Sequence, residues 1–424
     1  MKAKDIFKDE SFIECLKRKK AFDEKGNRIK IFNSKYEIVE KNINKVIKID
    51  CSDCSEYIIS YIKGISIFKN LKNLFLTNHR IERLPGEIGN LKNLEILDLY
   101  DNWIKEIPKE IGNLENLEIL VLSYNEIKKL PNEIENLRSL KELALSWNQI
   151  ENLPEEIWNL VNLKKLNLYR NQIKIFPKEI GKLKNLEILD LRKNKLKEIS
   201  KEIWKLVNLK ELNLSENQVE EIPNEIWNLI NLEILDLENN NLQQLPKEIG
   251  NLKNLIWLYL SNNNLQQLPN EIWNLINLEI LDLENNKLQW LPKKIWNLQN
   301  LEVLYLNNNQ LQYLPEEIGQ LKSLKKLYLS INQLQWLPKE ILGLSKLKWI
   351  WLNNAFDLNN LKQDPEELLD ILQKLKDKNV FYDDDLKYLE EEVYPVLEEK
   401  IKEKYKIDDL KNFKNNLTFD NLNF

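Results

Sequence analysis

The sequence is poor in the residues on which most enzyme sites depend. It contains one histidine, His79, and its three cysteines end at Cys54. No cysteine is therefore available as a nucleophile in the C-terminal part of the chain. The nine glycines include no G-x-x-x-x-G-K-[ST] string, which excludes the usual phosphate loop. A single histidine also makes a Ser-His-Asp triad a poor hypothesis. We expect no catalytic residues, no cofactor and no enzymatic activity.

The few cysteines also bear on disulfides and metals. An odd number, confined to Cys15, Cys51 and Cys54, predicts no disulfide framework and favours a reducing compartment. Cys51-x-x-Cys54 would suit zinc, but only Cys15 and His79 remain to complete four ligands. We therefore expect no metal site, and we expect the cysteine pair to pack in an N-terminal cap. The acidic run 383–385 lacks the glycine and the spaced ligands of a calcium loop and predicts the start of a helix.

Charge and hydropathy exclude further classes. Charged residues make up 30% of the chain, yet the net charge is only −5, so neither nucleic acid nor an anionic membrane is indicated as a partner. Charges interrupt every apolar run in residues 1–22, which excludes the hydrophobic core of a signal peptide. No run reaches the roughly 18 apolar residues of a membrane span. We expect a cytoplasmic protein and leave export without a cleavable signal open.

What the sequence does have is a repeat. Leucine recurs every 23 residues from Leu71 to Leu347, and each unit reads L-x-x-L-x-L-x-x-N-x-L-x-x-L-P-x-E-I-x-x-L-x-x, numbered here as positions 1 to 23. Positions 1, 4 and 6 predict the inward face of a short strand. The asparagine at position 9, present in every unit from Asn102 to Asn332, predicts a ladder of buried amides bonded to neighbouring coils. His79 occupies the same position and is predicted to substitute for that asparagine. Proline at position 15 suits the first residue of a short helix.

This repeat resembles the leucine-rich repeats of the Ras-group family, found in intracellular adaptors and in many bacterial repeat proteins. The resemblance runs from about Leu71 to Asn354. It implies an α/β leucine-rich repeat solenoid, a horseshoe with a parallel concave sheet, short convex helices or 3-10 turns, and a helical C-terminal cap. It also implies a scaffold for protein binding or signalling. The abundance of Lys, Asn and Ile suggests an AT-rich genome, such as that of a bacterium.

The two ends depart from the repeat. We predict an N-terminal helical or irregular segment over 1–43 and a degenerate capping repeat over 44–70, with Ile47 and Ile49 in strand positions. The repeat array itself would cover 71–363. Beyond Asp364-Pro365 the spacing of apolar residues predicts helices, so a helical C-terminal cap and tail would occupy 364–424. Such caps cover the open edges of an array.

The strand positions that point outward give the candidate partner-binding residues. Positions 3, 5 and 7, with flanking positions 2 and 8, show a basic group, an acidic group and an aromatic group along the chain. The predicted binding residues are Trp257, Tyr259, Tyr305, Tyr328, Trp349, Trp351, Lys165, Arg170, Arg192, Asp236 and Asp282. Trp and Tyr are typical of binding hot spots, and Tyr305 and Tyr328 are the best candidates. Trp349 and Trp351 could instead pack under the C-terminal helices.

We expect a monomer that binds one partner protein on the concave face. Two alternatives remain open: a regulatory or inhibitory subunit of an enzyme, and a secreted bacterial effector. A third is carbohydrate or small-ligand binding, for which Trp257, Tyr259 and Tyr305 would provide stacking platforms.

Two aromatic columns lie away from this face. At position 19, tryptophans replace the glycine of other units, and we expect them to fill space between coils on the convex side; they are Trp158, Trp204, Trp227, Trp273 and Trp296. At position 13, Trp290, Tyr313 and Trp336 predict a second aromatic ridge on the descending side. The segments Asn224–Pro246 and Asn270–Pro292 are near-copies, and Gln244 of the first corresponds to Trp290 of the second.

Overall fold

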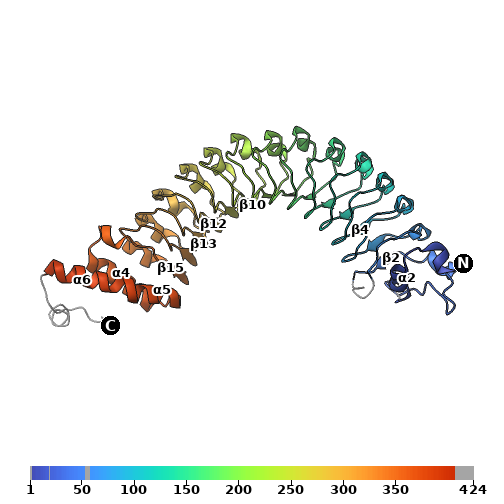
Figure 1. The fold of residues 1–424 in the computed structure, drawn as a ribbon. Helices are drawn as coiled ribbons and strands as arrows, with labels where there is room; N and C mark the ends of the chain where they lie inside the picture. The colour runs from blue at the N-terminus through green and yellow to red at the C-terminus, as the bar shows by residue number, and fades with distance from the viewer. Residues whose placement is uncertain (1, 19, 53–57, 406–424) are drawn as a thin grey trace. The chain divides into compact units, whose positions relative to one another are not determined.

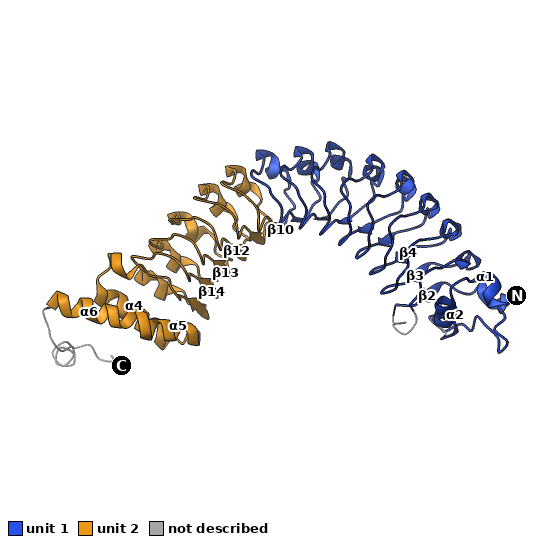
Figure 2. Ribbon diagram, in the orientation of Figure 1, with its two compact units in different colours: residues 1–235 blue, residues 236–424 orange. Residues whose placement is uncertain are grey.

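The computed structural model describes residues 2–18, 20–52 and 58–405 (Figure 1). These residues form two compact units, 1–235 and 236–424, and the boundary falls within strand β10 (Ile234–Asp236) (Figure 2). Residues 406–424 of the predicted C-terminal cap and tail lie outside the described residues. Each unit is described in turn.

Unit 1 begins with short helices and continues as a stack of repeats. The helices are α1 (Ala3–Ile6), α2 (Glu10–Lys17) and α3 (Glu40–Ile43), and β1 (Ala21–Phe22) pairs antiparallel with β2 (Lys48–Asp50). From β2 onward, consecutive strands pair in parallel. These strands are β3 (Asn73–Phe75), β4 (Ile96–Asp98), β5 (Ile119–Val121), β6 (Glu142–Ala144), β7 (Lys165–Asn167), β8 (Ile188–Asp190) and β9 (Glu211–Asn213).

Unit 2 is likewise a stack of repeats, and it ends in a helical cap. Its parallel strands are β11 (Trp257–Tyr259), β12 (Ile280–Asp282), β13 (Val303–Tyr305), β14 (Lys326–Tyr328) and β15 (Trp349–Trp351). The cap comprises α4 (Pro365–Asp377), α5 (Asp383–Tyr388), a π-helical turn (Leu389–Val393) and α6 (Tyr394–Tyr405). Figure 1 shows α4, α5 and α6 gathered beside β15. Parallel pairing at a spacing of 23 residues confirms the predicted leucine-rich repeat solenoid fold.

The core of each coil is formed as the alternation predicts. Leu163, Leu166 and Leu168, at positions 1, 4 and 6, are fully buried, and their counterparts line the interior of the other coils. In the capping repeat the register differs from the prediction. Ile49 is buried and pairs with Leu74, but Ile47 lies before β2 and is half-buried, while Val46 and Cys51 are fully buried.

The predicted asparagine ladder is present. The Asn102 side-chain carbonyl accepts from the Ile81 backbone N–H (3.0 Å), and its amide donates to the carbonyls of Leu76 (2.8 Å) and Leu99 (3.1 Å). Asn309, in unit 2, makes the equivalent bonds to Leu288, Leu283 and Leu306. Each amide therefore satisfies backbone groups of its own coil and of the preceding coil, where the chain leaves the strand.

The convex turns are 3-10 helices, η2 to η13, each beginning one residue later than predicted. Unit 1 carries Gly86–Asn90, Lys109–Asn113, Asn132–Asn136, Glu155–Asn159, Lys178–Lys182, Lys201–Lys205 and Asn224–Asn228; unit 2 carries Lys247–Asn251, Asn270–Asn274, Lys293–Asn297, Glu316–Gln320 and Lys339–Gly343. Shorter turns, η1 (Ile65–Ile67) and η14 (Leu358–Asn360), occur near the two caps. Pro108 is the N-cap, with extended ψ of 147°, and not the first helical residue. Its carbonyl accepts from Ile111, which closes the turn.

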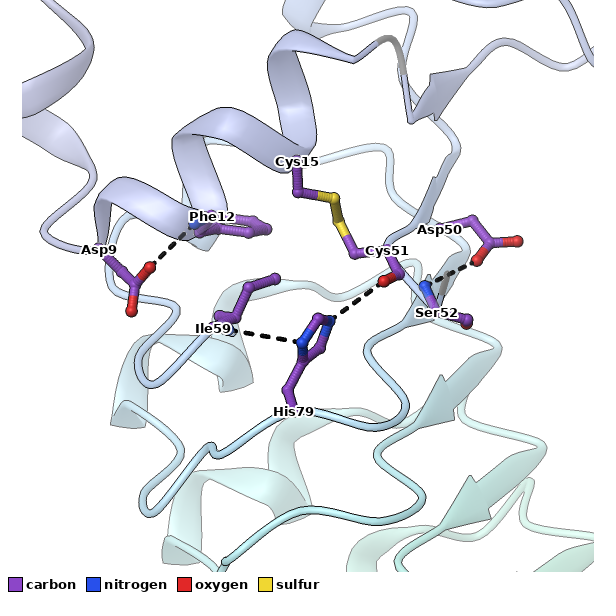
Figure 3. Close-up of a disulfide and its surroundings, with 8 residues drawn as sticks. All are labelled: Asp9, Phe12, Cys15, Asp50, Cys51, Ser52, Ile59 and His79. Atoms are coloured by element: carbon purple, nitrogen blue, oxygen red, sulfur yellow. Dashed lines mark hydrogen bonds between the residues drawn. A yellow bond between two sulfur atoms is a disulfide. The ribbon is translucent and has the colours of Figure 1, made fainter. Parts of the chain in front are cut away.

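A disulfide between Cys15 and Cys51 contradicts the expectation of unpaired cysteines. Cys15 lies on α2, Cys51 directly follows β2, and their Cα atoms are 6.1 Å apart (Figure 3). Both cysteines are fully buried. The sequence separation of 36 residues concealed this pairing, because only the docking of α2 against β2 brings the two residues together. Cys54 lies outside the described residues.

His79 substitutes for a ladder asparagine, as predicted. Its Nδ1 accepts from the Ile59 backbone N–H (3.4 Å), and its Nε2 lies 3.1 Å from the Cys51 carbonyl oxygen (Figure 3). This arrangement requires the neutral ring with the proton on Nε2. Burial lowers the pKa of His79 and favours the same neutral form.

The C-terminal cap closes the last strand with backbone and carboxylate groups. The backbone N–H of Ile350 donates to the Val380 carbonyl (2.9 Å), so the segment before α5 extends the sheet by one bridge. Asp385 on α5 is 1% exposed, and its Oδ1 accepts from the backbone N–H groups of Leu352 (2.7 Å) and Asn353 (2.9 Å). The predicted apolar face of α4 is buried. The edge of the array is thereby covered.

The tryptophans at position 19 are not all structural, which corrects the prediction. Trp158, Trp204 and Trp273 are fully buried, but Trp227 is 48% exposed and Trp296 is 45% exposed. In unit 2, Trp273 follows Gly250, where an added Cβ would lie 2.2 Å from the Glu271 carbonyl oxygen. The small residue lets the next coil approach closely and leaves room for its tryptophan. Trp296 follows a coil already filled by Trp273 and points to solvent.

Candidate protein-binding face on the strands

A row of stacked aromatic rings occupies the strand face of unit 2. Tyr305, Tyr328 and Trp351 are aligned by the parallel register of β13, β14 and β15. Their ring centroids are 4.4 Å apart for the two tyrosines and 3.7 Å apart for Tyr328 and Trp351, with nearly parallel planes. All three remain partly exposed. The repeat thus presents a pre-ordered apolar strip with hydroxyl groups along it.

The C-terminal cap extends this row without hiding it. Tyr382, the residue before α5, stacks on Trp349 (4.3 Å) and on Trp351 (4.8 Å), and is itself 41% exposed. Trp349 and Trp351 thus contact the cap through Tyr382, and both remain partly exposed. We call Tyr305, Tyr328, Trp349, Trp351 and Tyr382 the aromatic row. Sequence reasoning missed Tyr382 because it lies outside the repeat.

The hydroxyl of Tyr328 stays protonated across the physiological range. Burial and the neighbouring Tyr305 hydroxyl raise the pKa of Tyr328 to about 12. Tyr328 therefore offers the row a neutral hydrogen-bonding group.

The remaining predicted residues of unit 2 lie beside the row. Asp282 on β12 stands between Tyr259 and Tyr305 in the strand register, so these two tyrosines are not adjacent. Trp257, on the same strand as Tyr259, is 37% exposed. Asp236 accepts from the Glu238 backbone N–H (3.0 Å), and its negative charge contributes to the raised pKa of Tyr259, behind burial. The row is thus bordered by an acidic area.

Lys165 and Arg192 of the predicted basic group, on unit 1, are paired with acidic residues. Lys165 lies 3.8 Å from Glu142, and Arg192 pairs with Asp190 at 2.8 Å. The flanking lysines are paired in the same way, Lys164 with Glu187 and Lys193 with Glu216. Three of these partners lie 23 residues away, so the repeat period itself was a usable signal for them. The group carries little net positive charge.

Arg170 is the exception in this group. Its guanidinium lies 3.5 Å from the centroid of the Trp147 ring, and no ion pair joins it to the described residues. Trp147 in turn stacks on Tyr124 (4.5 Å). Tyr100 and Tyr169 contact the two ends of this group. Unit 1 therefore has its own aromatic cluster, which sequence reasoning missed.

Two of the missed residues, Tyr124 and Trp147, lie at position 8, where the backbone is left-handed in every repeat. The φ angles run from 51° to 59°, and the chain places Tyr124, Trp147 and Arg170 in this region. Asparagine tolerates the left-handed backbone, whereas bulky residues lose conformational energy in it. In unit 2 most repeats carry asparagine here, but the β-branched Ile331 has φ 55° and is 55% exposed. Residues that accept both strain and exposure often serve a function.

Comparison with known proteins agrees with the fold. A family model described as leucine-rich repeat region matches residues 42–154 and 199–282, and one described as leucine rich repeat matches 161–219 and 276–334. A solved leucine-rich repeat protein of Leptospira interrogans is 37% identical, covers 79% of this chain and 96% of its own, and superposes with a TM-score of 0.64. The chain belongs to the leucine-rich repeat family. No curated protein sequence matches it.

Two further solved structures resemble this leucine-rich repeat protein. An internalin from Listeria monocytogenes, 24% identical, covers 82% of this chain and 96% of its own with a TM-score of 0.69, which supports the fold alone. A plant peptide hormone receptor, solved in complex with RGF2, is 32% identical over 68% of this chain, with a TM-score of 0.61. This chain spans about half of that receptor, 48% of its length.

The described residues contain no helix that is both long and apolar enough to cross a membrane. In the same part of the chain, no three His, Cys, Asp or Glu side chains are grouped so that they could hold a metal ion.

Proposed function

We propose that this leucine-rich repeat protein is a non-enzymatic scaffold that holds a partner protein on the strand face of unit 2. The observation that carries the proposal is the aromatic row. Its rings are stacked on one another and so are already ordered, which reduces the entropy lost when a partner is bound. Their exposed edges combine apolar area with hydroxyl groups, as binding hot spots do.

The surroundings of the row favour a partner segment with apolar and cationic side chains. Asp282 lies next to Tyr305 at one end of the row, and Asp236 lies two strands farther on, so a lysine or arginine of the partner would find both carboxylates and ring edges. Ile331, three residues after Tyr328, adds an exposed apolar side chain. The plant receptor solved with RGF2 is a precedent for a bound partner on a similar fold.

A double variant, Tyr305→Ala/Tyr328→Ala, tests the proposal. Wild-type and variant protein would be immobilised and exposed to extracts of the source cells and to proteins from the medium around those cells. The affinity of each retained protein would then be measured. We expect the variant to bind the partner at least about tenfold more weakly, because two central rings are lost. Trp296→Ala is the matched control, since Trp296 is an exposed ring of unit 2 away from the strand face. Equal loss in the control, or no loss in the double variant, would contradict the proposal.

Ile331→Asn is a second test variant, in which weaker binding could not result from a folding defect. Asparagine is favoured in the left-handed region, so the variant should gain about 1 kcal/mol of stability. We expect the same change to weaken partner binding. If the partner proves to be an enzyme whose activity falls on binding, the regulatory-subunit alternative takes precedence over the scaffold.

We also propose that the protein works in an oxidising compartment, as an exported bacterial protein, and not in the cytoplasm. The disulfide Cys15–Cys51 supports this, because buried disulfides persist outside the reducing cytosol. The similar structures from Leptospira and Listeria agree with a bacterial source.

A further inference from the structure

A strip of uncharged residues runs along the descending side of unit 2, beyond the ends of the strands. At position 12, five consecutive repeats carry glutamine: Gln243, Gln266, Gln289, Gln312 and Gln335. At position 13, the last three of these repeats carry Trp290, Tyr313 and Trp336. In every repeat from Leu71 to Leu209, position 12 holds a charged residue instead. The change from charged residues to glutamine at position 12 therefore occurs in unit 2, on its descending side.

The three rings of this ridge are exposed and separate. Trp290 is 44% exposed, Tyr313 is 45% exposed and Trp336 is 40% exposed. Tyr313 and Trp336 are joined by a parallel β-bridge, and Gln335 donates a backbone hydrogen bond to the Gln312 carbonyl (2.7 Å), so the coils carry them in register. Within the described residues, none of the three contacts another aromatic ring. Each of the three residues therefore keeps 40–45% of its surface exposed without another ring stacked on it, whereas the rings of the aromatic row cover one another.

A hollow of about 330 Å³ adjoins the ridge where it meets the C-terminal cap. Tyr313, Trp336, Gln312 and Gln335 line one side of it. The two glutamine side chains form no hydrogen bond with any described residue, so each amide is available as a donor and an acceptor. This volume is at the lower end of the range for ligand pockets, about 300–1,000 Å³.

The other side of the hollow comes from the segment leading into α4. Gln363 is buried. Its side-chain oxygen accepts from the Leu337 backbone N–H (2.9 Å) and its amide nitrogen donates to the Leu337 carbonyl (2.9 Å), so its position in the wall of the hollow is fixed. Asp364 caps α4 and pairs with Lys404, which holds the pKa of Asp364 below its usual range. Lys362 and Glu367, of opposite charge, complete the lining. The hollow thus has no strong net charge to attract an ion.

We propose that this ridge and its hollow bind an uncharged oligosaccharide. Open Trp and Tyr faces pack against the apolar faces of sugar rings, and the amides match hydroxyl groups, which also both donate and accept. Successive coils are separated by about 4.8 Å, so the paired Gln and aromatic residues repeat along one direction. A glycan chain has the matching property of a repeated unit. This site is separate from the aromatic row and does not depend on its function.

The near-copy in the sequence supplies the variants for the test. Gln244 and Gln267 occupy position 13 in neighbouring repeats, so Trp290→Gln/Tyr313→Gln/Trp336→Gln places a residue there that the fold already accepts. The intact protein would be titrated by calorimetry with hexamers of β-1,4-glucose, α-1,4-glucose and β-1,4-N-acetylglucosamine and with an uncharged mannan. Tyr305→Ala/Tyr328→Ala and Trp296→Ala serve as controls that remove two aromatic rings from the strand face and one from the convex side.

We expect at least one of these glycans to bind, the triple variant to bind about tenfold or more weakly, and both controls to bind as wild type. Binding confined to a sulfated or carboxylated glycan, or to a proline-rich peptide titrated in parallel, would overturn the proposal. So would an absence of binding throughout the panel, or binding that the triple variant retains. Loss of glycan binding in Tyr305→Ala/Tyr328→Ala alone would also overturn the proposal and assign the sugar to the strand face instead.

Discussion

Asp282 shows how the setting of one residue changes its chemistry. It lies on β12 between Tyr259 and Tyr305, and the backbone N–H of Glu284 donates to its carboxylate (3.0 Å). Burial is the main cause that raises the pKa of Asp282 to about 6, and the charges of Glu284 and Glu238 add to it. Nothing in the sequence distinguishes Asp282 from an ordinary surface aspartate. Its neighbours on adjacent coils make the difference.

We predict that Asp282→Asn is more stable than wild type at pH 7 and equally stable below about pH 4. Between the ordinary pKa of 3.8 and the folded value of about 6, the folded chain keeps a proton that the unfolded chain has released. Stability therefore falls as pH rises through this window, by at most about 3 kcal/mol. The variant removes this loss. Chemical unfolding at several pH values, followed by tryptophan fluorescence, measures the difference.

Glu279→Gln is the control for this prediction. It removes one negative charge from an exposed side chain of the same repeat. If Glu279→Gln reproduces the pH profile of Asp282→Asn, net charge and not burial is responsible.

At the scale of elements, the contacts of the caps cannot be predicted from the repeat. The repeat explains β11 to β15 and the 3-10 turns, but the bridge from Val380 to Ile350 and the carboxylate of Asp385 follow no period. The sequence predicted the helix start at residues 383–385 and the buried face of α4. It did not predict that Asp385 would turn back to the last strand. That contact depends on where the helix docks.

We predict that Asp385→Ala destabilises unit 2 by about 2–4 kcal/mol, whereas Asp385→Asn is nearly neutral. The Oδ1 atom satisfies two backbone N–H groups that would otherwise be buried without partners. Oδ2 is buried without a hydrogen-bond partner, and burial raises the pKa of Asp385, so the negative charge adds nothing. Thermal unfolding of the two variants measures the contrast. An asparagine variant as damaged as the alanine variant would mean that the charge itself is needed.

At the scale of the molecule, each coil of such a stack is stabilised by its contacts with neighbouring coils. The terminal coils have a repeat neighbour on one side only, so the caps contribute to the stability of the array. In unit 1 the N-terminal end is held by the disulfide, by the pairing of β1 with β2, and by His79 bonded to Cys51. The cysteine count alone pointed to a reducing compartment. The pairing of Cys15 with Cys51 is the observation behind our proposal of an oxidising compartment instead.

We predict that Cys15→Ser/Cys51→Ser lowers the stability of unit 1 by about 4 kcal/mol, from the entropy of closing a loop of 36 residues. Unfolding in denaturant with and without reductant measures the effect. When native cells are quenched in acid and the protein is unfolded in denaturant, Cys15 and Cys51 should react with an alkylating agent only after reduction. Full alkylation without reductant would place the protein in the cytoplasm after all.

The sequence by itself determined the fold, the coil register, the core columns and the asparagine ladder, because each follows from a period within one short stretch of chain. It also placed Tyr305 and Tyr328 on the strand face. Only the tertiary structure decided which side chains of the non-repeating segments meet the repeats: Cys15 with Cys51, and Tyr382 with Trp351. These contacts depend on how the non-repeating segments dock, which no period in the sequence encodes. A periodic pattern determines the backbone position of each repeat residue. The contacts of its side chain also depend on segments that do not follow the period.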